Sequence, residues 1–457
     1  MIALKEKKIT IFGLGQSGLA AAKKLISLGA TVLVTEERNR DDIDNGNLAE
    51  IQNLGISLEC GGHTLASIEN SELIVMSPGI HLDLAVLKEA KKRGIPIISE
   101  IELAYNLIGK PIIAVTGTNG KTTTVTLISK ILESAGKRVA AAGNIGNPLI
   151  SVDDKNLDVV VVETSSYQLE GTLEFKPWIS ILLNITEDHL ERHENMEEYA
   201  KAKSRIFANQ KNSDFTIYNI EDCHILSIVK NAKSKLVPFS LERELDCGLF
   251  LKKDFITARL GGKEIPILRK EDIKIQGKHN LENVLASSAA ALIAGARAIT
   301  IKECLRLFRG LEHRIEHVKT LFGVEFYNDS KSTNPDSAIA ALRTLKQNII
   351  LIAGGKDKGT DISPLCNEIC KTAKTIILLG EAKERFSKAL IEHGFRNIHS
   401  VLNMEEAVTL AFNIAKKGDK VLLSPACSSF DMFKNFEERG EVFKNAVLAL
   451  EKKLKGE

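Results

Sequence analysis

A single pattern recurs three times along this 457-residue chain: a short β-branched apolar run, a glycine-containing loop and a helical stretch. The three segments are KITIFGLGQSG from Lys8, PIIAVTGTNGKTT from Pro111 and NIILIAGGKDKG from Asn348. Uninterrupted apolar strands that lead into helices are typical of parallel sheets covered on both faces. A chain of this length also exceeds one ordinary core. We therefore predict an α/β fold with three domains in series.

The expected domains cover residues 1–102, 103–309 and 310–457. The first and third are expected to be Rossmann-like, and the second a P-loop ATPase-like, mostly parallel sheet with helices on both faces. Within the first, a helix is expected over residues 20–28. Short, charge-rich strands between residues 215 and 275 predict an antiparallel edge to the second sheet. One helix over residues 277–298 is expected to close that domain.

Composition excludes several classes of protein. The 61 Lys and Arg residues nearly balance the 59 acidic residues, which leaves no electrostatic footprint for nucleic acid or an anionic membrane. The seven cysteines form no CxxC pair, so reduced core thiols are expected rather than zinc ligands. The chain shows neither a signal peptide nor an apolar run near the roughly 18 residues that a membrane span needs. We expect a monomeric cytoplasmic protein with small-molecule partners.

The loop after the second recurring strand has the composition of a phosphate-binding loop. It consists of Gly117, Thr118, Asn119, Gly120, Lys121, Thr122 and Thr123. It is shorter than the pattern GxxxxGK[ST], because only two residues separate its glycines. Lys121 and Thr122 nevertheless stand where charge neutralisation and Mg²⁺ ligation require them, at the start of a helix. A plain strand-to-helix turn would not explain the lysine and the threonines together, so the loop predicts ATP binding.

Acidic residues follow two further apolar runs of the second domain. Glu163 ends DVVVVE, and Glu187, Asp188 and His189 follow ILLNIT. The carboxyl ends of parallel strands form one crevice, so these side chains are expected near the Lys121 loop. Mg²⁺ prefers hard oxygen ligands, which suits a glutamate and a threonine hydroxyl. A lone histidine is more often structural than a ligand.

The N-terminal GLGQSG has the GxGxxG spacing, with Glu36 at the end of the next strand. Alone, this pattern indicates an NAD-dependent dehydrogenase. It reports only that a pyrophosphate approaches a helix N-terminus, so a diphosphate-bearing substrate explains it at least as well. Glycines that serve only helix packing remain a third interpretation.

Polar clusters flanked by apolar strands recur in the third domain, at residues 311–318, 327–338, 354–361 and 422–440. Such clusters are expected at the edge of a crevice, where function concentrates. Lys331, Lys358 and Ser429 are candidates for binding carboxylates. Arg314 and Asp329 are candidates for contacting a nucleotide. Surface solvation explains any one lysine, but it explains the whole set less well.

Taken together, the motifs resemble those of the Mur ligase family, specifically the members that add D-glutamate. The resemblance rests on GLGQSG, MSPGI, GTNGKTTT, ETSSYQLE, NITEDHLERH, YAKAKSRIF, GKHNLENVLA, HRIE, NDSKSTNPDSA and SPACSSFDMFKNFEERG. It implies a UDP-sugar-binding domain, a central ATPase domain and a C-terminal amino-acid domain. It further implies an ATP-dependent ligase of peptidoglycan synthesis, which joins D-glutamate to the alanyl carboxylate of UDP-N-acetylmuramoyl-L-alanine through an acylphosphate and a tetrahedral intermediate.

The resemblance also implies roles for individual residues. The UDP-substrate would meet Gly15, Gln16, Ser17, Glu36, Arg38, Ser77, Pro78, Gly79, Asn144 and Ser165. Besides the loop 117–123, ATP would meet Asn280, Asn283, Arg314, Asp329 and Lys331. D-Glutamate would meet Thr333, Lys358, Ser429, Phe430 and Phe436. The catalytic residues would be Lys121, Glu163, His189 and Lys203. Two Mg²⁺ ions would be held by Thr122, Glu163, His189 and Lys203, the last matching the family's carbamylated lysine.

One departure from the family pattern concerns the second strand. It ends in Glu36, Glu37 and Arg38, where the resemblance leads us to expect an aspartate, a small polar residue and an arginine. The contacts to uracil are therefore the least certain part of the implied site.

Three other functions remain open from the sequence. A folylpolyglutamate-type ligase shares the ATP loop and the amide chemistry but lacks an N-terminal GxGxxG domain. A dehydrogenase with an additional nucleotide domain belongs to a different class, and NADH binding would reveal it. A nucleotide-gated binding protein would bind these ligands without turnover.

Overall fold

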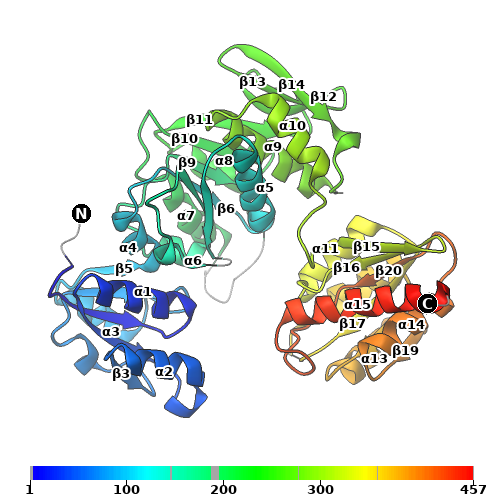
Figure 1. The fold of residues 1–457 in the computed structure, drawn as a ribbon, viewed down its shortest axis with the longest axis horizontal. Helices are drawn as coiled ribbons and strands as arrows, with labels where there is room; N and C mark the ends of the chain where they lie inside the picture. The colour runs from blue at the N-terminus through cyan, green and yellow to red at the C-terminus, as the bar shows by residue number, and fades with distance from the viewer. Residues whose placement is uncertain (1–3, 145–146, 187–194, 276, 358, 456–457) are drawn as a thin grey trace. The chain divides into compact units, whose positions relative to one another are not determined.

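The computed structural model describes residues 4–144, 147–186, 195–275, 277–357 and 359–455. The chain divides into two compact units, residues 1–274 with 278–308, and residues 275–277 with 309–457. The first unit contains a five-stranded and a nine-stranded sheet, and the second a six-stranded sheet. Helices lie against the strands in each part of the chain (Figure 1). The predicted α/β fold is confirmed, with one sheet for each of the three domains expected in series.

The first sheet is entirely parallel, in the order β3-β2-β1-β4-β5. Its strands are β1 Lys8–Phe12, β2 Thr31–Glu36, β3 Ser57–Cys60, β4 Leu73–Met76 and β5 Ile97–Ser99. The accompanying helices are α1 Gln16–Ser27, η1 Arg40–Asp42, α2 Asn45–Asn53, η2 Leu65–Ile68 and α3 Ala85–Lys92. Helix α1 begins four residues before the expected start at residue 20, because its first turn is polar and lacks the apolar period that marks a helix.

The second sheet has the order β14-β13-β12-β11-β10-β9-β6-β8-β7. Its strands are β6 Ile112–Thr116, β7 Val139–Gly143, β8 Val159–Glu163, β9 Ile179–Leu182, β10 Phe215–Asn219, β11 Lys235–Ser240, β12 Gly248–Lys252, β13 Phe255–Leu260 and β14 Lys263–Arg269. The helices of this part are α4 Glu100–Leu107, α5 Lys121–Ser134, η3 Leu149–Ser151, α6 Ser166–Glu170, α7 Met196–Ser204, η4 Arg205–Phe207, α8 Cys223–Val229, η5 Lys270–Asp272, α9 Lys278–Ile293 and α10 Ala298–Leu307.

Two expectations for this sheet need correction. Only β12, β13 and β14 pair in antiparallel fashion, whereas β10 and β11 continue the parallel sheet. Strand β10 is buried along most of its length, so its polar residues are satisfied inside the sheet rather than exposed at an edge. The single helix expected over residues 277–298 is two helices, because α9 ends before Gly295 and α10 begins at Ala298.

The third sheet has the order β15-β16-β20-β17-β18-β19, with only β15 antiparallel to its neighbour. Its strands are β15 Glu316–Leu321, β16 Val324–Asn328, β17 Ile349–Gly354, β18 Ala373–Leu379, β19 Ile398–Ser400 and β20 Lys420–Leu423. The helices are α11 Pro335–Leu345, α12 Ser363–Thr372, α13 Lys383–Glu392, α14 Met404–Ile414 and α15 Phe436–Lys455. Separate apolar clusters cover the two faces of the sheet.

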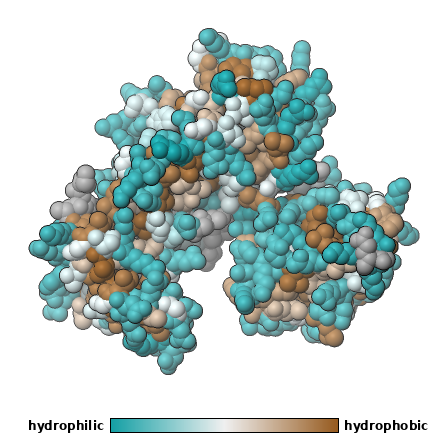
Figure 2. All heavy atoms as spheres, viewed as in Figure 1, coloured by the Kyte–Doolittle hydropathy of each residue, from teal (hydrophilic) through white to brown (hydrophobic). Residues whose placement is uncertain are grey.

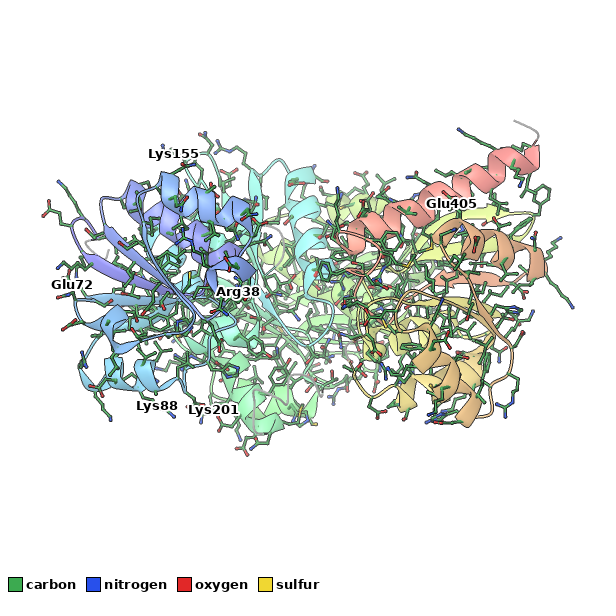
Figure 3. The ribbon with its side chains drawn as sticks, turned by 90° about the horizontal axis from the view of Figure 1, so that it is seen from below. Arg38, Glu72, Lys88, Lys155, Lys201 and Glu405 are labelled. Atoms are coloured by element: carbon green, nitrogen blue, oxygen red, sulfur yellow. The ribbon has the colours of Figure 1, made fainter. Side chains whose placement is uncertain are left out.

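Polar side chains cover much of the surface that Figure 2 shows. The face of the second unit seen in Figure 2 is mainly hydrophilic, with small hydrophobic areas between polar ones. Charged side chains such as Lys88, Lys155 and Glu405 are exposed (Figure 3). Within the described ranges, no helix has the length and apolar character needed to cross a membrane. All seven cysteines are free thiols.

Helix α4 joins the first two sheets through two buried carboxylates. Glu102 accepts hydrogen bonds from the backbone N–H groups of Leu173, Glu174 and Phe175, each at 2.9 Å. Glu100 accepts one from the N–H of Ile150 at 2.7 Å, and its other oxygen has no hydrogen-bond partner among the described residues. Burial raises the pKa of Glu100 to about 7, which the single hydrogen bond only partly offsets.

Replacement of Glu100 by glutamine should stabilise the protein above neutral pH. A carboxyl group whose pKa rises from 4.5 to about 7 on folding binds its proton more tightly in the folded protein, so stability falls as the pH rises through this range. Glu100→Gln keeps the acceptor for Ile150 and removes that penalty. We expect the variant to be more stable than the wild type by up to about 3 kcal/mol at pH 8, with a much smaller difference at pH 5.

Urea denaturation at the two pH values measures this difference. Glu102→Gln is the matched control on the same helix, and it should destabilise the protein at both, because an amide nitrogen cannot accept the N–H bonds that the carboxylate accepts. Equal stability of wild type and Glu100→Gln at pH 8 would contradict the prediction.

Candidate active site

The carboxyl ends of four adjacent strands gather the candidate catalytic residues of the first unit. Strands β9, β6, β8 and β7 are neighbours and run parallel, so the segments that follow them emerge along one edge of the sheet. The loop 117–123 follows β6, Glu163 ends β8, and residues 183–186 follow β9. This is the edge at which open α/β sheets bind their ligands.

The loop 117–123 turns directly into helix α5, which begins at Lys121. The Lys121 ammonium group donates to the carbonyl oxygens of Gly117 and Thr118, at 2.9 and 2.8 Å. Gly120 has φ +85°, and a Cβ at this position would lie 2.2 Å from Oδ1 of Asn283. Only glycine fits here, and the N–H groups of the first helical turn can therefore face an anion.

A residue that the sequence interpretation missed fixes the loop from β9. Asn184 accepts the Thr118 N–H through its carbonyl at 2.9 Å and the Asn119 N–H through Oδ1 at 2.8 Å. Its Nδ2 donates back to the Asn119 carbonyl at 3.1 Å. The available signal was an asparagine placed immediately after the buried run ILL. Asn184 thus ties the loop to the neighbouring strand.

The other predicted nucleotide residues of this unit lie on α9. Asn283 is buried and accepts a hydrogen bond from Thr124 Oγ1 at 3.2 Å, and its Nδ2 donates to Asn280 Oδ1 at 3.3 Å. Thr124 belongs to α5, so the pair connects α9 to the helix that carries the loop. The structure therefore brings Asn280 and Asn283 close to the predicted phosphate loop.

Glu163 has an arrangement that suits a cation. Its side chain is 2% exposed, and Oε1 accepts a hydrogen bond from Asn144 Nδ2 at 3.1 Å. The buried Oε2 has no hydrogen-bond partner within the described part of the chain. An ionised oxygen without a donor is costly in a protein interior, and a hard cation would satisfy it. Glu163 therefore fits the metal-ligand role predicted for it.

Lys203 lies beside the same loop. Its side chain is 2% exposed, its ammonium group donates to the Gly117 carbonyl at 3.1 Å, and it stands 4.3 Å from the centre of the Tyr199 ring. Lys121 and Lys203 thus share one carbonyl acceptor. Glu187, Asp188 and His189 lie outside the described residues. Ser165 caps helix α6 together with Gln168, so its hydroxyl already has a structural role.

The candidate UDP-substrate residues gather at the carboxyl ends of β1, β2 and β4. Gly15, Gln16 and Ser17 open α1, while Ser77, Pro78 and Gly79 follow β4, the parallel neighbour of β1. The Ser77 hydroxyl donates to the Gly13 carbonyl at 3.0 Å. This hydrogen bond connects the loop after β4 to the loop after β1.

Glu36, which stands where the family pattern leads us to expect an aspartate, forms hydrogen bonds within the protein. Its carboxylate accepts the Leu14 N–H at 2.6 Å and two side-chain hydrogen bonds from Arg38, at 3.0 and 3.2 Å. Burial alone would raise the pKa of Glu36, but these hydrogen bonds outweigh it and lower the pKa to about 2. Glu36 therefore orders the glycine loop and orients Arg38, which is labelled in Figure 3.

In the second unit, the loops after β16, β20 and β17 emerge along one edge of the sheet. Asp329 is buried after β16 and accepts hydrogen bonds from Ser332 Oγ at 2.5 Å, Ser424 Oγ at 2.7 Å and the Ile315 N–H at 3.2 Å. Burial raises the pKa of Asp329 to about 6 despite these bonds. Asp329 thereby holds three segments of the candidate site together.

The remaining candidates lie around this edge. The Lys331 ammonium group stands 4.8 Å from the centre of the Phe436 ring, and the Thr333 N–H donates to the Lys331 carbonyl at 2.8 Å. Ser429 is buried, whereas Phe430 is 71% exposed. Lys358 lies outside the described residues. The structure brings Lys331 and Phe436 together and leaves Phe430 at the surface.

Arg439 was not singled out from the sequence, although among the described residues its side chain is the largest fully buried one. It donates to Ser330 Oγ at 2.9 Å, to the Ser330 carbonyl at 2.8 Å and to the Cys427 carbonyl at 3.0 Å. It therefore joins the loops that follow β16 and β20. In the sequence it stands within the charged run FEERGE, where a solvated arginine is the ordinary expectation.

Comparison with solved structures finds the same fold in other proteins. The structure of a UDP-N-acetylmuramate-alanine ligase from Thermotoga maritima aligns with a TM-score of 0.58 and 20% identity, covering 97% of this chain and 99% of that one. A pseudomurein peptide ligase type C from Methanothermus fervidus aligns with a TM-score of 0.56 and 19% identity, covering 97% and 100%. At these identities the similarity shows the fold.

Sequence comparison identifies the family. Residues 7–99 match the Mur ligase MurD-like N-terminal domain, residues 115–291 the Mur ligase middle domain, and residues 313–427 the Mur ligase glutamate ligase domain. The UDP-N-acetylmuramoylalanine--D-glutamate ligase of Caldanaerobacter subterraneus subsp. tengcongensis is 44% identical over 98% of this chain and 99% of its own. The protein of the same name from Pelotomaculum thermopropionicum is 42% identical over 98% of each. The chain therefore belongs to the Mur ligase family.

Proposed function

We propose that this chain is an ATP-dependent ligase that joins the amine of D-glutamate to the alanyl carboxylate of UDP-N-acetylmuramoyl-L-alanine, with release of ADP and phosphate. Its relatives of 42–44% identity carry the name of this activity over nearly their whole length. The observation that carries the proposal is the edge of the second sheet, where Lys121, Lys203 and an unsatisfied Glu163 oxygen surround one phosphate loop.

The first step is activation of the carboxylate. A carboxylate does not react with an amine, because oxide would have to leave. The alanyl carboxylate oxygen attacks the γ-phosphorus of ATP, the bond to the bridging oxygen breaks, and ADP leaves. The loop 117–123 holds the phosphates through its N–H groups, and the Lys121 ammonium group turns from the loop carbonyls to neutralise them. The product is an acylphosphate.

The second step forms the amide. The D-glutamate amine, having lost its proton, attacks the acyl carbon, and the tetrahedral intermediate expels phosphate. We place D-glutamate against Thr333, Lys358, Ser429, Phe430 and Phe436, and the nucleotide against Asn280, Asn283, Arg314, Asp329 and Lys331. The hydrogen bonds of Asp329 and Arg439 hold the loops after β16 and β20 in place for this contact.

Magnesium fits the donors at the loop. Thr122, Glu163 and His189 would hold it, and Lys203, after carbamylation by CO₂, would supply a carboxylate for a second ion. Bound Mg²⁺ neutralises phosphate charge in such sites. The unsatisfied Glu163 oxygen and the burial of Lys203 beside Gly117 support this assignment.

The UDP-sugar would lie at the first sheet, against Gly15, Gln16, Ser17, Glu36, Arg38, Ser77, Pro78 and Gly79. Its muramoyl-alanine end would reach Asn144 and Ser165, which neighbour Glu163 in the fold. Because these substrates are precursors made inside the cell, we assign the protein to the cytoplasm.

The substrate requirement tests the proposal directly. Phosphate release should require UDP-N-acetylmuramoyl-L-alanine, D-glutamate and Mg²⁺ together, and it should stop when the metal is chelated. L-Alanine, L-lysine and diaminopimelate, tested with UDP-muramoyl acceptors of different lengths, should give no release. Turnover with one of these and none with D-glutamate would move the chain to another ligase of the family.

The metal role of Glu163 gives a second test. Glu163→Gln keeps the acceptor for Asn144 and removes the negative charge at the unsatisfied oxygen. The Mg²⁺ concentration for half-maximal activity should rise at least about tenfold, with a lower maximal rate. Glu133→Gln, an exposed change on α5, should leave both values unchanged. An unaltered Mg²⁺ dependence in Glu163→Gln would show that this carboxylate is not a ligand.

A further inference from the structure

Helix α15 approaches the turn that carries Arg314 unusually closely. Gly440 lies in the second turn of this 20-residue helix, and a Cβ placed there would stand 2.1 Å from Nδ1 of His313. Glycine is a poor helix former, and nothing in the backbone of α15 demands it at this position. The glycine therefore serves the contact with the imidazole ring.

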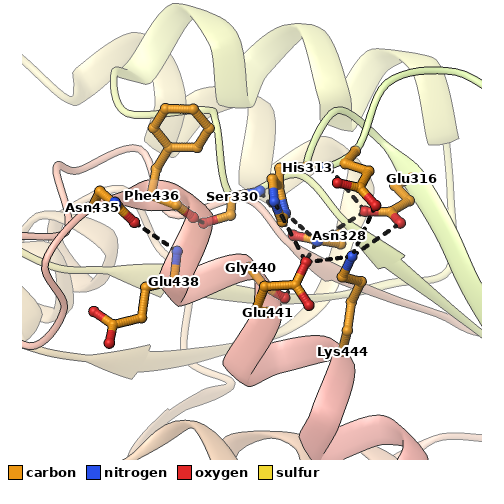
Figure 4. A network of polar contacts seen from close by, with 11 residues as sticks. His313, Glu316, Asn328, Ser330, Asn435, Phe436, Glu438, Gly440, Glu441 and Lys444 are labelled. Carbon is orange, nitrogen blue, oxygen red and sulfur yellow. Dashed lines mark hydrogen bonds and ion pairs between the residues drawn. The ribbon is translucent and has the colours of Figure 1, made fainter.

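His313 is held in a backbone conformation that a histidine rarely adopts, with φ +62°. Asn328 Nδ2 lies 2.9 Å from the ring Nδ1, and Glu316 Oε2 accepts the His313 N–H at 2.9 Å (Figure 4). The His313 carbonyl accepts the Lys331 N–H at 3.1 Å. The position of this one residue therefore sets the backbone of Arg314, its neighbour, and of Lys331.

Lys444 connects α15 to this turn by charge. Its ammonium nitrogen lies 2.6 Å from Glu441 Oε1, 3.5 Å from Glu312 Oε1 and 3.6 Å from Glu316 Oε1 (Figure 4). Glu441 Oε1 in turn lies 3.8 Å from His313 Nε2. The Lys444 side chain is only 16% exposed. Without its charge, the carboxylates of two segments would repel each other at short range.

The lysine keeps its charge in this position. Burial lowers the pKa of Lys444, but the hydrogen bond with Glu441 and the charges of Glu316 and Glu312 outweigh it, so the pKa is raised. The carboxylates and His313 lie close enough to suggest a cation site. The ammonium group already neutralises them, so the cluster is an ion-pair network.

We propose that Lys444 is a positioning residue: it clamps α15 to the turn 311–316 and thereby fixes Arg314 for the nucleotide. The inference rests on the proposed function, in which Arg314 contacts ATP. Lys444 lies four residues beyond the motif that ends in FEERG, so a helix of the amino-acid domain sets the geometry of a nucleotide contact. Lys444 itself touches neither ligand in this account.

Two variants disturb the clamp from different sides. Lys444→Met keeps the length of the side chain and removes its charge, while Gly440→Ala favours the helix but pushes against His313. Each should raise the KM for ATP about tenfold and leave the KM for D-glutamate within about twofold. Lys444→Arg should restore the wild-type KM. Lys319→Met removes another ion pair of α15, the one with Glu451 at 3.1 Å, and should change neither KM.

The melting temperature of each variant separates positioning from folding. A lower melting temperature with an unchanged KM for ATP, or the same rise in KM in Lys319→Met, would overturn the proposal. ATP binding measured by calorimetry on the free protein gives the same comparison without turnover. An inactive wild type would contradict the proposed function. Weaker ATP binding by Lys444→Met and Gly440→Ala than by the wild type would support the clamp even in that case.

Discussion

The two lysines that meet at the Gly117 carbonyl are the interaction on which the proposed site depends. Lys121 and Lys203 come from different helices, and both ammonium groups donate to one oxygen of the phosphate loop. The two ammonium groups therefore bring positive charge to the loop that is proposed to hold the phosphates. The buried Glu163 oxygen has no hydrogen-bond partner among the described residues, and a bound cation would satisfy it.

The order of the strands explains how such groups come together. In each sheet, side chains that follow adjacent parallel strands meet at one edge, where many of the UDP, ATP and amino-acid candidates lie. Side-chain hydrogen bonds then hold the loops in place. Asn184 holds the phosphate loop, Glu36 holds the glycine loop, and Arg439 holds the loops of the third sheet. Within each unit, these hydrogen bonds therefore hold the candidate loops in place.

Much of this was accessible from the sequence, because apolar runs before glycine loops identify the strands and the phosphate loop. The hydrogen bonds that hold the loops were not. Asn184 contacts a residue 65 positions away, and Arg439 one 109 positions away, and spacing along the chain carries no signal for such pairs. Glu36, predicted to meet the UDP-substrate, also accepts hydrogen bonds from Leu14 and Arg38, an internal role that the sequence pattern did not indicate. The MurD-like match of residues 7–99 favours the diphosphate interpretation of GLGQSG over the dehydrogenase.

The account requires that an oxygen of the alanyl carboxylate become bonded to phosphorus before the amide forms. The most direct measurement uses UDP-N-acetylmuramoyl-L-alanine labelled with ¹⁸O in that carboxylate and follows the released phosphate by mass spectrometry. When the amine attacks the acylphosphate, phosphate leaves with the carboxylate oxygen attached, so the account predicts one labelled oxygen in each phosphate formed with D-glutamate present. Unlabelled phosphate, released alongside the amide, would contradict it.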